Sequence, residues 1–359
     1  MNSLLHCWQS VRCFSSTIGI AIIFFLLLSS VAELAVRSDL FLSSMTTPRM
    51  GGRHGQFEFQ LHRLDRALAN KGRIDCIFLG SSMVLLGLNP STFQNAYAIP
   101  TGQSLQCFNF GVDAMPAAAA GEIAQILIHD YHPRLLIYGT DARDYAVPPT
   151  MKDTTAIRDI PWVRYRMGKF SIEGALFEYS YAYRYKTSLR HLLRFNRGVL
   201  LRKEKNISGF DPDPETRFDI RQHPLVYENA YHVKYYYEML SNYRMFRQNL
   251  EGLDSILRQN TANTRIVLVE MPVPSTYMHF FKNGRRDHQR FVEQVSARAE
   301  HYKVPFVQTS QLGLIPDDGW VDYSHLNTKG AQIFSNWLAS KIGVLTKMLT
   351  FNRSALFAS

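Results

Sequence analysis

The sequence lacks the common patterns that bind metals, nucleotides or nucleic acids. Its 4 cysteines do not stand in zinc-finger spacing, and His129, His132 and His232 have no carboxylate or cysteine at ligand spacing. No Gly-Lys-Ser/Thr phosphate loop and no arginine-rich run occurs in the 359 residues. We therefore expect no metal, no cofactor and no nucleic-acid partner.

Apolar residues and positive charge are what the chain does have. A chain with 46% hydrophobic and 13% aromatic residues can bury a large core. This composition excludes a chain that is disordered throughout. The 40 basic and 30 acidic side chains leave a net charge of +10. A surplus of this size favours anionic partners such as lipid headgroups or acidic glycans.

Charge is missing from one long segment near the N-terminus. No charged residue lies between Cys13 and Ala32, and this run is apolar enough to cross a bilayer. Arg12 precedes it, which favours a cytoplasmic N-terminus and an exported remainder, periplasmic or extracellular. The small residues Ser30 to Ala32 would also suit signal peptidase, so a cleaved signal peptide stays open. Because apolar residues continue to Val36, we expect an uncleaved single-pass anchor in the cell membrane.

Composition divides the chain into four parts. Residues 1–37 form the anchor or signal peptide, and residues 38–57, rich in Ser, Thr, Pro and Gly, read as a tether. Residues 58–348 form the main domain, and residues 349–359 form a tail. Within the domain, residues 150–231 are rich in Arg, Lys, Tyr and Phe, and we interpret them as an insertion over the fold.

Strand-like apolar runs alternate with helical patterns in the main domain. This alternation is typical of a parallel sheet, so we expect an α/β fold, a three-layer sandwich whose parallel sheet is flanked by helices. The predicted strands are 74–79, 105–110, 134–138, 265–270 and 305–308, and the predicted helices are 58–70, 116–129, 231–259, 286–301 and 328–348. Cys76 and Cys107 fall in or beside strands, where we expect unpaired core residues; a disulfide between them is the alternative.

Residues suited to acyl chemistry follow the predicted strands. The first strand ends at Gly80-Ser81-Ser82 before a periodic apolar pattern, and far downstream Asp322 and His325 precede the last helix. A serine hydroxyl is a weak nucleophile at neutral pH, and a histidine held by a carboxylate activates it. The loops at the carboxyl ends of parallel strands meet at one edge of the sheet, so we expect these groups to meet there. Read separately, the Gly-Ser-Ser is a common turn, and Asp-x-x-His could belong to a helix cap at Asn327.

Together these motifs resemble the SGNH (GDSL-like) hydrolase superfamily, whose fold is SGNH/flavodoxin-like. The closest likeness is to its membrane-anchored branch, which includes alginate O-acetylation and teichoic-acid D-alanylation proteins. The family's Gly-Asp-Ser block matches Gly80 to Ser82, which implies that Ser82, in preference to Ser81, is the nucleophile; Asp-x-x-His matches Asp322 and His325. The resemblance implies that Gly111 gives its amide to the oxyanion hole. It covers about 74–341, with 150–231 unmatched.

The third block of the family departs from the pattern. It reads Gly-x-Asn-Asp there, whereas this chain has Gly139-Thr140-Asp141-Ala142. An ionised Asp141 only accepts hydrogen bonds and would repel a developing oxyanion. Either Asp141 is protonated, or Asn109 or a backbone amide stabilises the oxyanion, or turnover is slow. We expect Asp113 and Asp144 to be solvated loop carboxylates; contact with a polar substrate is the alternative.

Two functions are consistent with this sequence. The first is a membrane-tethered serine esterase or O-acyltransferase that acts on acyl esters of an extracytoplasmic polysaccharide or glycan, with a membrane-bound acyl-donor protein as a possible partner. The second is a non-catalytic polymer-binding or assembly component of an exopolysaccharide system. The basic stretch from Arg184 to Lys205 is either a solvated helix face or a surface for anionic headgroups or an acidic polymer.

Overall fold

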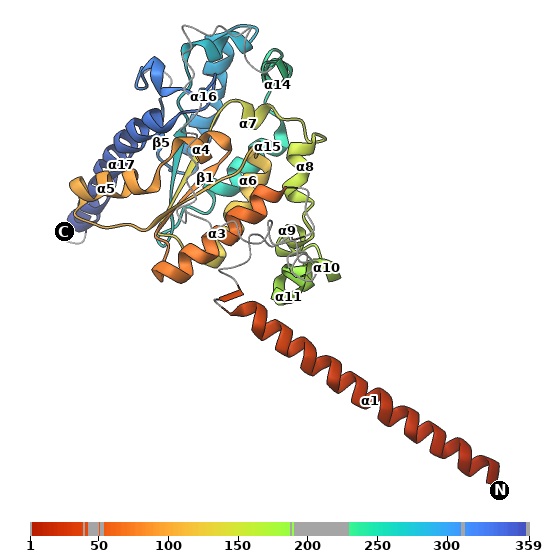
Figure 1. Ribbon diagram of the computed structural model, residues 1–359. Coiled ribbons are helices and arrows are strands. Elements are labelled where there is room, and N and C mark those ends of the chain that lie inside the picture. The colour runs from red at the N-terminus through yellow and green to blue at the C-terminus, as the bar shows by residue number, and fades with distance from the viewer. Residues whose placement is uncertain are drawn as a thin grey trace.

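A computed structural model describes residues 2–38, 40–41, 50, 54–186, 189, 230–309 and 313–356. Most of the tether, much of the insertion and most of the basic stretch 184–205 lie outside the described residues. A parallel five-stranded sheet forms the centre, in the order β2-β1-β3-β4-β5 (Figure 1). This is the doubly wound order of flavodoxin-like folds, so the predicted fold class is confirmed. The strands are β1 Cys76–Gly80, β2 Cys107–Gly111, β3 Leu135–Thr140, β4 Arg265–Glu270 and β5 Phe306–Val307.

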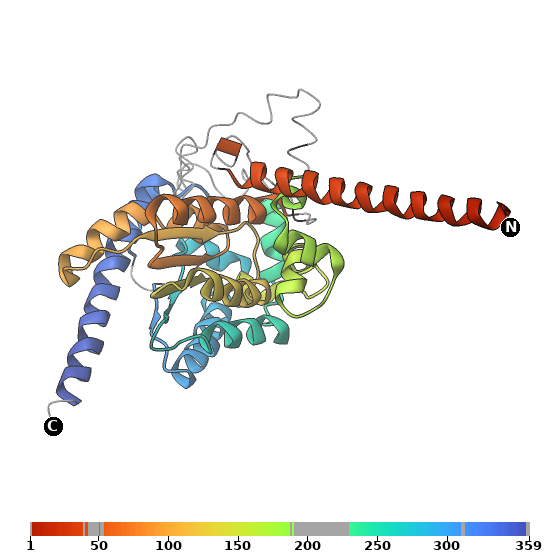
Figure 2. The same ribbon diagram turned by 90° about the horizontal axis from the view of Figure 1, so that it is seen from below.

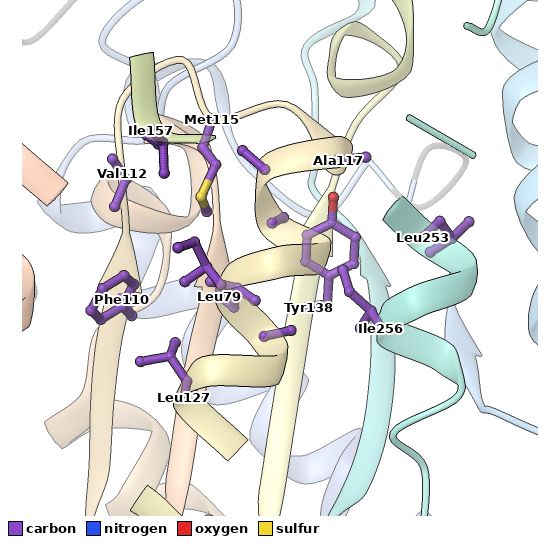
Figure 3. Packing of buried hydrophobic residues seen from close by; sticks show 14 of the residues in the cluster. Leu79, Phe110, Val112, Met115, Ala117, Leu127, Tyr138, Ile157, Leu253 and Ile256 are labelled. Carbon is purple, nitrogen blue, oxygen red and sulfur yellow. The ribbon is translucent and has the colours of Figure 1, made fainter. Parts of the chain in front are cut away.

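Helices cover both faces of this sheet because successive side chains of each strand point to opposite sides. On one face, Leu79 and Tyr138 belong to the same core cluster as Ile256, which lies beside Tyr138 (Figure 3), whereas on the other Phe78 packs with Phe93. The first face carries α3 (Gly55–Lys71), α6 (Ala117–Tyr131), α15 (Arg247–Leu257) and α16 (Arg285–His301), and the second carries α4 (Ser82–Gly87), α5 (Pro90–Thr101) and α17 (Thr328–Leu356). The result is the three-layer sandwich that the sequence predicted.

Several helix boundaries differ from the sequence-based expectation. The single helix predicted over 231–259 is wrong: α14 (Ala230–Leu240) and α15 are separated by a turn. Tertiary hydrogen bonds set the break, because the Phe246 N–H donates to the Tyr145 carbonyl and the Asn249 side chain donates to the Tyr145 and Val147 carbonyls. The helix α5 was not predicted, although Asn89 caps it through the Thr92 N–H. The last helix extends to Leu356, beyond the predicted end at 348.

Short helices follow β3; the first lies at the top of the domain in Figure 1, and the last three lie together beside the end of the N-terminal helix (Figures 1 and 2). They are α7 (Arg143–Ala146), α8 (Lys152–Arg158), α9 (Pro161–Arg166), α10 (Ile172–Tyr179) and α11 (Tyr181–Arg184). The N-terminal helix α1 spans Asn2–Arg37, and its segment Thr17–Arg37 has a mean hydropathy of 2.4 with an exposed apolar surface. Its length and composition suit a membrane span, a property that signal sequences share.

The two central cysteines are register partners on neighbouring strands. Cys76 of β1 lies opposite Cys107 of β2, and both are buried free thiols. Burial raises the pKa of Cys76 well above its ordinary value, so this sulfur stays protonated and unreactive. They act as core residues, and the alternative of a disulfide does not occur in the structure.

Candidate active site

Ser82 lies where β1 gives way to α4. The chain leaves the sheet at Gly80, and Ser81 is the N-cap, so Ser82 is the first residue of the helix. A Cβ at Gly80 would lie 2.4 Å from the carbonyl oxygen of Gly139 and equally close to Val84 Cγ2. Only glycine fits between β3 and the new helix, which explains the Gly-Ser-Ser sequence at this exit.

Asn109 and Gly111 pack against α4, and their polar groups are hydrogen-bonded there instead of facing an open oxyanion hole. The Asn109 Nδ2 donates to the carbonyl oxygens of Val84 and Leu88, each at 2.7 Å, and its Oδ1 accepts from the Gly111 N–H at 2.8 Å. A Cβ on Gly111 would lie 2.5 Å from Leu85 Cα. The amide that the sequence assigned to the oxyanion is therefore engaged by Asn109, and the glycine permits close approach of the helix.

His325 is presented by a short loop in front of α17. Trp320 and Leu326 form an antiparallel bridge across this loop, and the Val321 N–H donates to the His325 carbonyl at 2.8 Å. The Asn327 side chain accepts from the Gly330 N–H at 3.1 Å, which caps the helix. The capping interpretation of this motif is therefore correct, and the cap also fixes the loop that carries His325.

Ser82, His325 and Asp322 form one hydrogen-bonded chain. The His325 Nε2 lies 2.7 Å from the Ser82 Oγ, and its Nδ1 lies 2.7 Å from the Asp322 Oδ2. The other carboxylate oxygen accepts the N–H groups of Ser324 and His325, each at 2.8 Å. Because the carboxylate only accepts, the neutral imidazole carries its proton on Nδ1 and receives the Ser82 hydroxyl hydrogen at Nε2.

The electrostatics of this pair suit an ionised carboxylate beside a basic imidazole. Burial raises the pKa of Asp322, but the His325 charge and hydrogen bonds from that side chain and two backbone amides lower it to about 2. Burial lowers the pKa of His325, yet the charge and hydrogen bond of Asp322 outweigh this and raise the pKa above 6.5. Asp322 thus remains ionised at neutral pH and stabilises the protonated form of His325.

A tyrosine on α14 extends this chain, which the sequence did not predict. The Tyr236 hydroxyl lies 2.7 Å from the Ser324 Oγ, which donates to the Asp322 Oδ1 at 3.3 Å. Burial raises the pKa of Tyr236, so the phenol is neutral and donates to Ser324. Tyr236 stands in a run of tyrosines, and no spacing along the chain distinguishes it from its neighbours.

Asp141 lies at the end of β3, beside the strand that leads to Ser82, because Gly139 and Gly80 are register partners. Its side chain is buried; Oδ2 accepts from the Tyr277 hydroxyl at 2.8 Å, and Oδ1 has no hydrogen-bond partner in the part of the chain that the structure describes. Asp141 therefore lies close to the serine, as the topology predicted, with one oxygen occupied by a tyrosine.

Asp144 is also buried, so the expectation of a solvated carboxylate is wrong for it, whereas Asp113 is exposed. Arg143 donates from Nη2 to the Asp144 Oδ1 at 2.6 Å and from Nη1 to the Tyr235 hydroxyl at 3.1 Å. Burial and the nearby Asp141 charge raise the pKa of Asp144 well above its ordinary value. Asp141, Arg143 and Asp144 thus form one buried group at the end of β3.

The start of α4 offers an alternative oxyanion donor. Within the described residues, the backbone N–H groups of Ser82 and Met83 donate to no protein acceptor. The first N–H groups of a helix have no partner inside it and point at the space before its N-terminus. The Ser82 amide can therefore meet the negative oxygen that forms when its own hydroxyl attacks a carbonyl.

Comparison with known proteins gives only distant likenesses. No family model and no curated protein matches the chain. Among solved structures, it is similar to Est24, a carbohydrate acetylesterase from Sinorhizobium meliloti (11% identity, TM-score 0.36, 76% of this chain and 100% of that one). It is also similar to an inhibitor-bound aryl esterase of M. smegmatis (12% identity, TM-score 0.33, 75% and 98%) and to BT4096, a gut microbial diltiazem-metabolizing enzyme (12%, 0.37, 75% and 47%). Likenesses of this size carry no argument about activity.

Proposed function

We propose that this chain is a membrane-tethered serine esterase or O-acyltransferase that acts on acyl esters of an extracytoplasmic polysaccharide or glycan. The observation that carries the proposal is the hydrogen-bonded chain from Asp322 through His325 to Ser82. A serine, an imidazole and a carboxylate in this order form the arrangement that activates a hydroxyl for acyl transfer. The net charge of +10 favours an acidic polymer or membrane nearby, and the exposed apolar α1 supplies the membrane anchor.

The reaction proceeds in two halves. The Ser82 Oγ attacks the acyl carbonyl carbon while the His325 Nε2 takes the hydroxyl proton, and the Ser82 N–H stabilises the oxyanion. The carbon–oxygen bond to the leaving alcohol breaks, and that alcohol takes the proton from His325. An acceptor hydroxyl, from water or a sugar, then gives its proton to His325 and attacks the acyl-serine carbonyl carbon. The bond from that carbon to the Ser82 Oγ breaks, and the Ser82 Oγ takes the proton back from His325. Asp322 holds the imidazole in the correct tautomer and stabilises its charged form throughout.

Hydrolysis and transfer use the same side chains and differ in the acceptor. In the transfer case, a membrane-bound acyl-donor protein delivers the acyl group, and the polymer hydroxyl takes it from Ser82.

The second candidate function is a non-catalytic polymer-binding component of an exopolysaccharide system. One observation favours it: Asp141 places a carboxylate where the resembled family has an amide donor.

Labelling with a fluorophosphonate probe tests the proposal. The folded chain should react at Ser82, and Ser82→Ala should abolish the reaction. Ser81→Ala is the matched control and should still react, because the Ser81 side chain is buried next to the reactive serine and makes no cap hydrogen bond. A folded chain that fails to react, yet binds an acidic glycan as well as Ser82→Ala does, would favour the non-catalytic candidate. Mass spectrometry of the mature N-terminus separates the anchor from a cleaved signal peptide.

A further inference from the structure

The end of α1 is joined to the domain through its first acidic residue. Glu33 is the first charged residue after the uncharged run. Its Oε1 accepts the Tyr181 N–H at 2.7 Å, and its Oε2 accepts the Ala182 N–H at 3.1 Å and the Ser180 hydroxyl at 3.0 Å. A carboxylate with three donors at the first turn of α11 is a fixed contact between α1 and the helices that follow β3.

Further contacts extend this joint into the sheet domain. Arg37 donates to the Tyr179 carbonyl at 3.2 Å. Val36 is buried in a small cluster with Tyr185, and the Tyr185 hydroxyl lies 2.7 Å from the His62 Nδ1 on α3. The described end of α1 is therefore packed against α11 and, through it, against α3, in addition to any connection through the tether.

The position of Glu33 along α1 sets the level of this joint relative to the bilayer. An uncharged helical run of about 20 residues rises about 30 Å, which is the thickness of the hydrocarbon core of a bilayer. In a chain whose α1 spans a membrane, Glu33 therefore lies at the boundary, and α11 and the last residues of α10 lie at the level of the headgroups. Figures 1 and 2 place α9, α10 and α11 together beside this end of α1.

Large apolar side chains are exposed on α10 and just before it. Four large side chains are exposed there: Phe170 (80%), Ile172 (72%), Leu176 (41%) and Tyr179 (69%). Ile172, Leu176 and Tyr179 are spaced four and three residues apart and share one helix face. Exposed Arg164 and Lys169 precede this face. Of the two acids within the helix, Glu173 is exposed, whereas Glu178 is half-buried and pairs with Arg166.

We infer that this α10 face rests in the interfacial layer of the membrane that α1 spans. Apolar and aromatic side chains bordered by basic ones are the composition of surfaces that lie at the headgroup boundary. Continuity with the membrane-spanning helix selects lipid as the occupant, because the joint at Glu33 holds the face at that depth. The domain is thus held in one orientation above the bilayer. The inference rests on the proposed anchor and is independent of the serine chemistry.

Quenching of a fluorescent label by brominated lipid tests this. The full chain, with Cys7→Ser and Cys13→Ser, is placed in phosphatidylcholine–phosphatidylglycerol vesicles, and bimane is attached to Ile172→Cys or, as a second variant, Phe170→Cys. The matched control is Ile99→Cys, an exposed apolar position on α5, away from α1 (Figure 1). Buried Cys76 and Cys107 do not take up the label.

Brominated lipid should lower the emission at Ile172 and Phe170 at least about twofold more than at Ile99. An equal loss of emission at all three positions on addition of brominated lipid overturns the inference. A label at Ile172 that is shielded from water but not quenched also overturns it, because protein then covers the face. Fluorophosphonate labelling of the same vesicles separates the two proposals, since a chain that reacts at Ser82 without quenching retains the proposed function and loses only the membrane contact.

Discussion

The Tyr277 hydroxyl donates to the Asp141 Oδ2 at 2.8 Å, so a tyrosine from the segment after β4 holds the carboxylate that follows β3. Burial raises the pKa of Tyr277 well above its ordinary value, and Asp141 raises it further, so the phenol stays neutral and donates. Asp141 is therefore held in a defined position at the end of β3, beside the strand that leads to Ser82.

Replacement of this carboxylate should raise activity. In Asp141→Asn the amide oxygen can still accept from Tyr277, while the amide nitrogen becomes a donor near the forming oxyanion. The rate of p-nitrophenyl acetate hydrolysis should increase by up to about 10²-fold. Tyr277→Phe is the control, because it removes the hydroxyl and leaves the carboxylate, and should give no gain. A folded Asp141→Asn that is no faster than the parent would show that Asp141 does not limit the reaction.

The activity should depend on pH through His325. The imidazole accepts the serine proton only when neutral, and Asp322 holds the pKa of His325 above 6.5, so kcat/KM should rise as pH increases through that raised value. Asp322→Asn removes the charge that raises this pKa, so the midpoint should move down, and kcat should fall about 10³–10⁴-fold. The measurement is a pH profile of kcat/KM for both proteins. An unchanged midpoint in Asp322→Asn contradicts the assigned pairing.

Tyr236 should act as a positioning residue for Asp322. Tyr236→Phe removes the donor to Ser324 at a cost of about 1 kcal/mol, so kcat should fall about fivefold and the midpoint of the pH profile should shift. The neighbouring Tyr237→Phe is a matched control, since its exposed hydroxyl makes no hydrogen bond within the described residues, and should leave both quantities unchanged. A loss of rate without any shift of the pH profile would indicate a role in packing alone.

Gly111→Ala should displace α4. The new Cβ would lie 2.3 Å from the Leu85 amide nitrogen, so the helix that presents Ser82 must move. The free energy of unfolding should fall by about 1–3 kcal/mol, measured by urea denaturation, and Ser82 labelling should slow. Gly55→Ala is the control, because its Cβ meets nothing within 4 Å. Equal stabilities of the two variants would exclude the close contact.

Much of the sheet could be predicted because it depends on local patterns. The runs around Cys76, Cys107, Leu135 and Arg265 became strands β1 to β4 with small shifts at their ends, since continuous apolar residues between turn signals specify buried strands. The break between α14 and α15 could not be predicted, because the Phe246 amide and the Asn249 side chain bond to a segment about a hundred residues earlier.

In the candidate site, too, residues with local signals could be predicted and residues that depend on long-range contacts could not. Ser82, Asp322 and His325 were predicted from short motifs, since each depends on its own strand exit or loop, and the structure brings their side chains together. Asn109 and Gly111 were assigned to the oxyanion, yet their partners lie on α4, more than twenty residues away in sequence. Tyr236 and Tyr277 reach the site from distant segments and carry no local signal.

The sequence by itself determined the strands, most of the long helices and the residue types available for acyl chemistry, because propensity, period and capping act between near neighbours. Only the tertiary structure decided which hydroxyl meets which imidazole, which amides remain free, and which buried acids lie together. Those outcomes depend on how the faces of the sheet and helices pack, and packing joins atoms that no spacing along the chain relates.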